Sequence, residues 1–76
     1  MFKNVQVGDR VWSSQYGYGI VEEVKSEDHY TYPIIVGFNT QTTQNYTMDG
    51  KSQQWHVGPT LFWKELDEKD YPKPPK

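Results

Sequence analysis

Cysteine is absent from the 76-residue chain, which excludes disulfides, thiolate zinc sites and cysteine nucleophiles. Leucine and alanine are scarce, and no hydrophobic run approaches the length of a membrane span. The opening segment Met1–Gln6 lacks the apolar stretch of a signal peptide. A chain of this length is one small domain, near the lower limit for a core without staples. We therefore expect a soluble, cytoplasmic protein that makes no contact with membranes.

An excess of positive charge is also missing. Eight basic and ten acidic side chains give a formal net charge of −2. Proteins that bind phosphate backbones usually carry a clear basic excess, because each neutralised phosphate contributes through counterion release. The charge therefore disfavours nucleic acid as the sole ligand, and it is too small for a mimic of DNA.

Aromatic residues are abundant by contrast, with three Trp, six Tyr and three Phe. Aromatic side chains bury a large area each, so they can build the core of a very small barrel. They also dominate the hot spots of protein–protein interfaces. The composition leaves open which aromatics belong to the core and which to an interface.

Short β-branched and aromatic segments, separated by Gly, Pro and polar residues, predict an all-β fold. No apolar period of 3.6 residues runs long enough for a helix. We expect strands at Asp9–Ser13, Gly19–Lys25, Ile34–Phe38, Thr43–Met48 and Thr60–Leu66, with a further short segment at Gln53–His56. Residues 1–67 are thus predicted to form one barrel of about five short antiparallel strands, and the charged, proline-rich residues 68–76 a flexible tail.

The alternation of side chains predicts which faces are buried. Val11 should lie on one face of its strand, with Arg10 and Trp12 on the other. In the next strand Val21 and Glu23 should share a face, and the irregular pattern around them suits a β-bulge or a sharp bend. Tyr46 and Met48 should share a face of the fourth strand, and Val5 and Val7 of the lead-in are expected to pack against the barrel.

Turn signals and the most apolar segment complete the fold prediction. Gly17 and Gly19 lie where the chain must reverse or bulge and where a Cβ would clash. Asp49 and Gly50 predict a type I′ hairpin turn, which needs positive φ at both residues. This turn should connect the fourth strand to the segment at Gln53–His56, or the two residues should end that strand in a tight corner. Ile34–Phe38 is the most apolar run and should be the central strand, and Pro33 is tolerated at its start.

Nothing in the sequence indicates catalysis. His29 and His56 are the only histidines, and neither has a second ligand at a metal-binding spacing. No nucleophile elbow, phosphate loop or positioned pair of carboxylates is present. We expect no catalytic residue, no metal and no cofactor.

The first predicted hairpin carries the best candidate site, because Arg10, Trp12, Tyr16 and Tyr18 should gather on one short ribbon. An aromatic cage for a methylated Lys or Arg is one hypothesis, and simple closure of a small core is the other. A nucleic-acid-binding barrel is the alternative function. In that case Trp12, Tyr16 and Tyr18 stack unpaired bases, while Lys3, Arg10 and Lys25 meet phosphates.

A second candidate surface combines Trp55, His56, Phe62 and Trp63. Strand alternation cannot bury Leu61, Phe62 and Trp63 on one face, so either Phe62 or its two neighbours must lie outside the main core. The exposed group suggests a partner surface. Alternatively, the lead-in Phe2–Val7 folds back and covers it.

The segments Gly8–Val11 (GDRV) and Tyr16–Val21 (YGYGIV) resemble the opening hairpin of small SH3-like, Tudor-like barrels. Similar hairpins occur in the RNA-polymerase-interacting domain of CarD-type transcription factors and in the C-terminal module of UvrD-type helicases. The chain lacks the DNA-binding and motor domains of those proteins, and residues 48–59 do not align with them. Its size suits a small bacterial or bacteriophage accessory protein.

The resemblance implies a non-enzymatic protein–protein interaction module that acts as an accessory or inhibitory factor on a transcription or DNA-processing machine. Its partner would be RNA polymerase or another nucleic-acid-processing enzyme, contacted through Arg10, Tyr18, Ile35 and neighbouring sheet residues. With the two aromatic groups included, the predicted partner-binding residues are Arg10, Trp12, Tyr16, Tyr18, Ile35, Trp55, Phe62 and Trp63. The sequence leaves the oligomeric state open.

Overall fold

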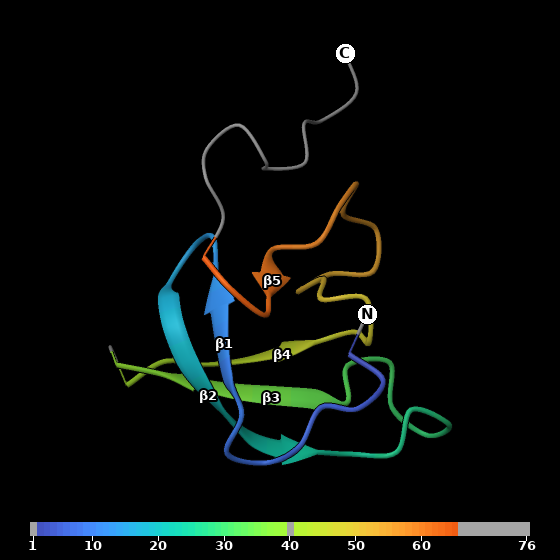
Figure 1. Ribbon diagram of the computed structural model, residues 1–76. Coiled ribbons are helices and arrows are strands. Elements are labelled where there is room, and N and C mark those ends of the chain that lie inside the picture. The colour runs from blue at the N-terminus through green and yellow to red at the C-terminus, as the bar shows by residue number, and fades with distance from the viewer. Residues whose placement is uncertain (1, 40, 66–76) are drawn as a thin grey trace.

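The computed structural model describes residues 2–39 and 41–65, which form five strands joined by turns and loops, with no helix among them. The strands are β1 (Arg10–Ser13), β2 (Gly17–Val24), β3 (Ile34–Phe38), β4 (Thr43–Tyr46) and β5 (Leu61–Phe62) (Figure 1). They make one antiparallel sheet in the order β4-β3-β2-β1-β5. The predicted all-β fold of about five antiparallel strands is confirmed, and the predicted tail at 68–76 lies outside the described residues.

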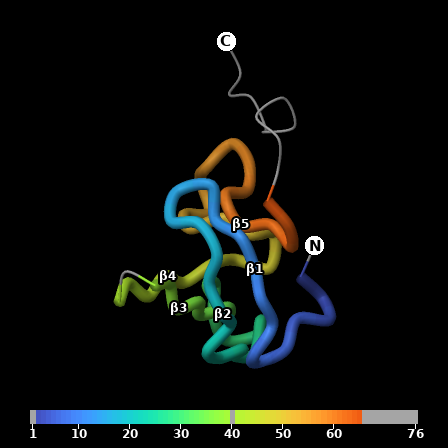
Figure 2. Tube along the Cα trace, turned by 60° about the vertical axis from the view of Figure 1, so that its left-hand side comes forward, coloured from blue at the N-terminus to red at the C-terminus, as the bar shows by residue number. Residues whose placement is uncertain are grey.

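The sheet curls because β2 belongs to both of its halves. The first part of β2 pairs with β1, and the part from Gly19 to Val24 pairs with β3. Figures 1 and 2 show β2 bending from the β1 direction toward the β3–β4 hairpin, which projects to one side. β4 and β5 lie at opposite edges and do not pair with each other in the described part of the chain. The architecture is therefore a curled half-barrel whose middle strand is β2. The prediction that Ile34–Phe38 is the central strand is off by one position, because this strand, β3, lies between β2 and β4.

A β-bulge at Glu22 explains the bend. The β2–β3 register pairs Val21 with Val36 but Glu23 with Ile35, so Glu22 is the extra residue. The predicted bulge is thus confirmed. The prediction that Glu23 shares the face of Val21 is wrong, because the extra residue shifts the alternation by one position. Val24 turns inward in its place and packs against the core.

The two glycines of the β1–β2 hairpin serve different purposes. Gly17 has φ +83°, a conformation that residues with a Cβ rarely adopt, although a Cβ there would meet open space. At Gly19 a Cβ would lie 2.6 Å from the Phe38 ring and 2.7 Å from the Gly37 carbonyl oxygen. The predicted steric clash therefore holds for Gly19, while Gly17 is required by its backbone angle.

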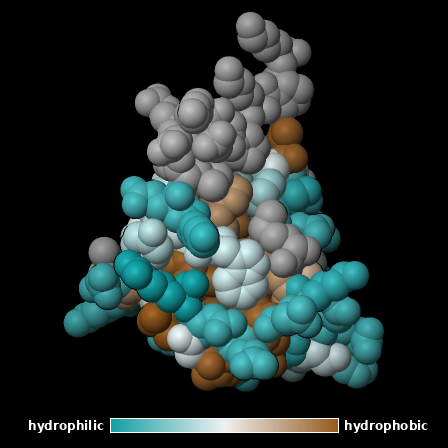
Figure 3. Space-filling model, viewed as in Figure 1, coloured by the Kyte–Doolittle hydropathy of each residue, from teal (hydrophilic) through white to brown (hydrophobic). Residues whose placement is uncertain are grey.

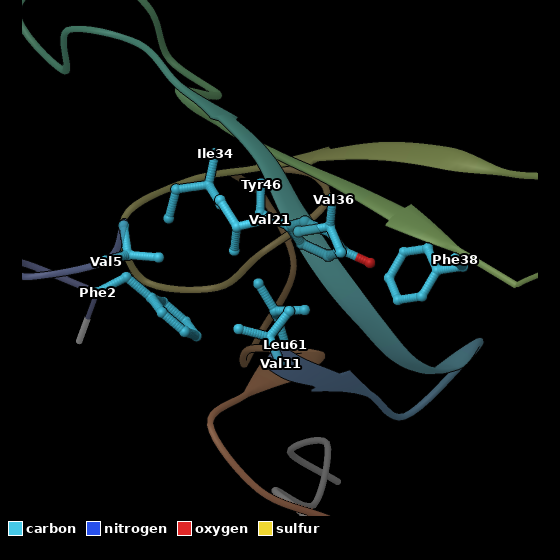
Figure 4. Close-up of a cluster of buried hydrophobic side chains, with 9 residues drawn as sticks. All are labelled: Phe2, Val5, Val11, Val21, Ile34, Val36, Phe38, Tyr46 and Leu61. Atoms are coloured by element: carbon cyan, nitrogen blue, oxygen red, sulfur yellow. The ribbon is translucent and has the colours of Figure 1, made fainter. Parts of the chain in front are cut away.

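The core fills the concave side of the curled sheet. Figure 4 shows its side chains converging from the N-terminal segment and all five strands. The buried members are Phe2, Val5, Val11, Val21, Ile34, Val36, Phe38, Tyr46 and Leu61. Val24 and Met48 pack against them, so the predicted common face of Tyr46 and Met48 is confirmed. Alternation along β3 places Ile34, Val36 and Phe38 in this set, because every second side chain of the strand points inward.

The N-terminal segment closes one side of the core. The Phe2 side chain is fully buried, and its backbone N–H donates to the Met48 carbonyl oxygen at 3.1 Å. Val5 is buried as expected, but Val7 is 65% exposed, so the prediction that it packs against the barrel is wrong. The turn before β1 directs Val7 outward, and the Asp9 carboxylate there accepts a hydrogen bond from the Gln6 N–H.

The chain after β4 departs most from the predicted strands. The Thr47 N–H donates to the Lys51 carbonyl and the Gly50 N–H to the Thr47 carbonyl. These bonds define a three-residue loop in which Gly50, with φ +84°, takes the left-handed position. Asp49 does not have positive φ, so the predicted type I′ turn is wrong. Residues 53–56 form turns instead of a strand, and β5 spans two residues because only Leu61 and Phe62 find partners on β1.

Candidate interaction surface

The convex side of β1, β2 and β5 collects an arginine, three aromatic rings and one aliphatic side chain. We call this surface the outer aromatic face and define it as Arg10, Trp12, Tyr18, Ile20 and Phe62. The strand registers bring them together: Arg10 is opposite Ile20, Trp12 is opposite Tyr18, and Trp12 is also opposite Phe62. Side chains directly opposite on one face of a sheet are in contact range. The predicted placement of Arg10 and Trp12 on the face away from Val11 is confirmed.

Two ring contacts hold the outer aromatic face in place. The Arg10 guanidinium carbon lies 3.8 Å from the centroid of the Tyr18 ring, a cation–π stack. The Trp12 and Phe62 ring centroids are 6.1 Å apart at an interplanar angle of 38°. The Tyr18 hydroxyl also accepts a hydrogen bond from the Glu65 N–H at 3.4 Å. These contacts fix the rings on short paired strands.

Exposure separates the supporting residues from those a partner can touch. Trp12 is only 7% exposed, although it lies outside the main core cluster, so it forms the floor of the face. Tyr18 and Phe62 are half-buried, Arg10 is exposed, and Ile20 is 47% exposed. Because the Ile20 side chain is half-exposed beside Arg10, a partner can contact it. Figure 3 shows that, on the side it views, apolar side chains lie as separate patches in a mainly hydrophilic surface.

Tyr16 and Ile35 do not join the outer aromatic face. The Tyr16 ring packs on Phe38 with a centroid separation of 5.2 Å, so it covers the open end of the core. The chain reverses at Gly17 between the two tyrosines, and this turn sends Tyr16 and Tyr18 to different sides. Ile35 is half-buried on the convex side of β3, opposite Glu23 and Asn45, beyond the bulge.

The second predicted surface is divided between three places. Phe62 belongs to the outer aromatic face, whereas Trp63 packs on Phe2 with a centroid separation of 4.9 Å. Trp55 is 72% exposed in the loop after β4, where its ring meets His56 edge-on. Leu61 is buried and Phe62 lies outside the core, so the prediction from strand alternation is confirmed for these two residues. The lead-in Phe2–Val7 does fold back. Of the second surface's residues, it makes a ring contact with Trp63.

Two of the hollows lined by described residues flank the sheet. The larger, about 610 Å³, is lined by Lys3, Val24, Lys25, Glu27, Met48 and Asp49. The smaller, about 160 Å³, adjoins the outer aromatic face and is lined by Arg10, Tyr18, Gly19, Ile20 and Asn39. The cations proposed for phosphate contact are thus divided, with two lysines beside two carboxylates in one hollow and Arg10 in the other. This division does not form the continuous basic groove that tracks a nucleic-acid backbone.

The described residues contain no group of three His, Asp or Glu side chains that could hold a metal ion. Within the same ranges, no helix is long and apolar enough to cross a membrane. Both histidines lie in loops, and His56 Nδ1 is 3.5 Å from the Ser52 hydroxyl.

Burial raises the pKa of the Tyr46 phenol, and the nearby Ser13 hydroxyl partly opposes this rise. That phenol lies in the core and faces no hollow described above.

The fold and this surface define a small all-β half-barrel with an aromatic, arginine-containing face on its convex side. Comparison of the chain with protein-family models, with curated proteins and with solved structures finds no match.

Proposed function

We propose that the protein is a non-enzymatic interaction module that binds another protein through the outer aromatic face. The observation that carries this proposal is the exposed Ile20 held directly opposite Arg10, whose guanidinium is stacked on Tyr18. Interface hot spots are enriched in arginine and aromatic residues that are held rigidly and ringed by contacts that exclude water. The floor made by Trp12 and Phe62 supplies that rigidity.

The kind of partner follows from the hairpin's resemblance to SH3-like barrels of CarD-type and UvrD-type proteins. RNA polymerase and other nucleic-acid-processing enzymes are the first partners to test, with this protein as an accessory or inhibitory factor. The net charge of −2 and the division of the cations between two hollows support a protein partner over a nucleic acid.

The proposal is tested by capture from a lysate of the source cells, with bound proteins identified by mass spectrometry. The informative variant is Ile20→Ser, because it removes an exposed apolar contact and leaves the core intact. Val57→Ser is the matched control, since Val57 is an exposed β-branched residue in the loop after β4. Each substitution should lower the free energy of unfolding by about 1 kcal/mol or less.

We expect wild type and Val57→Ser to capture the same partner, and Ile20→Ser to lose it. Equal capture by a folded Ile20→Ser variant would reject the outer aromatic face as the binding site. Titration with single-stranded and duplex oligonucleotides at low salt is the second arm. A submicromolar affinity that falls steeply with salt would instead establish the nucleic-acid-binding function.

A further inference from the structure

Arg10 is a cation whose charge is not paired within the described part of the chain. It begins β1 on the convex side, its side chain is exposed, and it makes no ion pair with any carboxylate of residues 2–39 and 41–65. The Tyr18 ring covers one face of the guanidinium plane at 3.8 Å. Stacking of this kind leaves the N–H donors at the edge of the plane free to bind an acceptor. Arg10 therefore presents an oriented fork of donors toward solvent.

The hollow beside Arg10 has the size and lining of a subsite for one side chain. Its volume of about 160 Å³ equals roughly five water molecules at about 30 Å³ each. Around the guanidinium it is lined by Tyr18, Asn39 and Ile20, and no carboxylate of residues 2–39 and 41–65 lines it. Gly19 contributes only backbone to this lining, because a Cβ there would point toward Phe38 in the core.

An arginine fork accepts either a carboxylate or a phosphate in bidentate geometry, so the surroundings must decide between them. Glu22 lies on the same convex side, with its carboxylate over the Cα of Gly37, and Gly37 is the residue opposite Ile20. A strand of phosphates crossing this face would meet that negative charge as well as the chain's net charge of −2. A single carboxylate needs only Arg10, and the exposed Ile20 provides an apolar contact next to it.

We infer that the hollow lined by Arg10, Tyr18 and Asn39 binds an Asp or Glu side chain of the partner protein, with a neighbouring apolar side chain of the partner on Ile20. This inference rests on the proposed function and names the chemistry that the outer aromatic face selects. The two contacts together distinguish the site from a general apolar surface, because an acidic residue followed by an apolar one is recognised as a pair.

The test is an NMR titration of the full chain with two blocked peptides, acetyl-Gly-Glu-Leu-Gly-amide and its match acetyl-Gly-Gln-Leu-Gly-amide. The glutamate peptide should shift the Arg10 Nε–H signal and the backbone amides of Tyr18, Gly19 and Asn39. The glutamine peptide should bind about tenfold more weakly, since a hydrogen bond to a charged group is the stronger kind. Arg10→Gln should remove the preference, and Arg10→Lys should restore only part of it, because lysine lacks the planar fork. Lys25→Gln, which removes a cation from the other hollow, should leave the preference unchanged.

The inference is overturned if the two peptides bind equally, if the Arg10→Gln variant keeps the preference, or if the glutamate peptide causes no shift at millimolar concentration. It is also overturned if inorganic phosphate or a single-stranded oligonucleotide shifts the same signals more strongly than the peptide. These failures are separate from failure of the proposed function. If Ile20→Ser loses partner capture while the two peptides bind equally, the outer aromatic face remains the binding surface. Binding of a partner's Asp or Glu side chain beside Arg10 is then rejected.

Discussion

The Arg10 guanidinium carbon lies 3.8 Å above the centre of the Tyr18 ring, and the two residues are diagonal neighbours across the β1–β2 pair. Diagonal neighbours in a sheet are within reach only of long or aromatic side chains. The contact therefore predicts an energetic coupling between the two residues. A double-mutant cycle with Arg10→Gln and Tyr18→Leu, followed by urea denaturation, should give about 0.5–1 kcal/mol. Tyr18→Phe is the control and should retain the coupling, and additive single-variant effects would show that the stack contributes no stability.

Two glycines with the same backbone angle should respond differently to alanine. Gly17 and Gly50 have φ +83° and +84°, but a Cβ at Gly17 meets open space. A Cβ at Gly50 would lie 2.6 Å from the Leu61 carbonyl oxygen and 2.9 Å from the Phe2 ring. Gly17→Ala should cost about 1 kcal/mol for the angle alone, and Gly50→Ala about 3 kcal/mol because overpacking is added. Urea denaturation measures the free energy of unfolding of the two variants. Equal losses would mean that a Cβ at Gly50 does not clash with Leu61 and Phe2.

The Tyr46 hydroxyl is buried in the core and makes no hydrogen bond within residues 2–39 and 41–65, since the nearby Ser13 hydroxyl does not meet it in hydrogen-bonding geometry. A buried polar atom in this situation costs free energy, so Tyr46→Phe should keep the packing and raise the stability by about 1 kcal/mol. Thermal unfolding at neutral pH measures the change. A clear loss of stability in Tyr46→Phe would show that the hydroxyl has a partner in solution.

The same phenol predicts how stability changes at high pH. Burial raises the pKa of Tyr46 in the folded state above its value of about 10 in the unfolded state. Below pH of about 10 the phenol is neutral in both states, so its contribution to the free energy of unfolding is complete. It is lost as the pH rises through the folded pKa, because only the unfolded state releases the proton easily. Wild type should therefore lose more stability than Tyr46→Phe above pH of about 10. Parallel curves for the two proteins would contradict the assigned shift.

Amide hydrogen exchange should divide β4 residue by residue. The Phe38 N–H donates to the Thr42 carbonyl, so in an antiparallel ladder Gln44 and Tyr46 bond to β3 while Thr43 and Asn45 point away from it. Thr43 and Asn45 should exchange fast, and Gln44 and Tyr46 slowly. Protection of Thr43 and Asn45 would mean that another strand covers this edge in solution. The slowest amides overall should lie at 21–24 and in β3.

The first half of the fold was predictable because its information is local. In β3 every second side chain is buried, so alternation gave both the strand and its inner face. In β1 the alternation placed Val11 in the core, although Trp12 on the other face is buried as well. The bulge was visible as an irregular pattern, but its position at Glu22 follows from the register with β3. Glu23 was misplaced because one extra residue reverses every later side chain.

The second half depends on contacts that no local pattern encodes. Phe2 precedes a polar segment, and its full burial results from contacts distant in sequence: it packs in the core and against Trp63, and its N–H donates to the Met48 carbonyl. Residues after Gly50 are held by isolated bonds, such as those from Thr60 and Leu61 to the Gly50 carbonyl, which leave no periodic signal.

The candidate site was predictable in part for the same reason. Arg10, Trp12 and Tyr18 were grouped correctly because one hairpin connects them. Phe62 joins them only through the β1–β5 pairing, and Tyr16 leaves because the chain reverses at Gly17. The signal that was missed is Ile20: it occupies an outward strand position on the same face as Trp12 and Tyr18 and so extends the aromatic group into a contiguous patch.

Site-specific photo-crosslinking tests most directly whether the outer aromatic face is the docking surface. A benzoylphenylalanine placed at Ile20 reports contacts at the centre of that face, and one at Tyr30, an exposed aromatic in the β2–β3 loop, serves as the control. We predict that illumination in a lysate of the source cells gives one major crosslinked protein from position 20 and none from position 30. The same crosslink from position 30 only, or equal crosslinking from both, would contradict binding through the outer aromatic face.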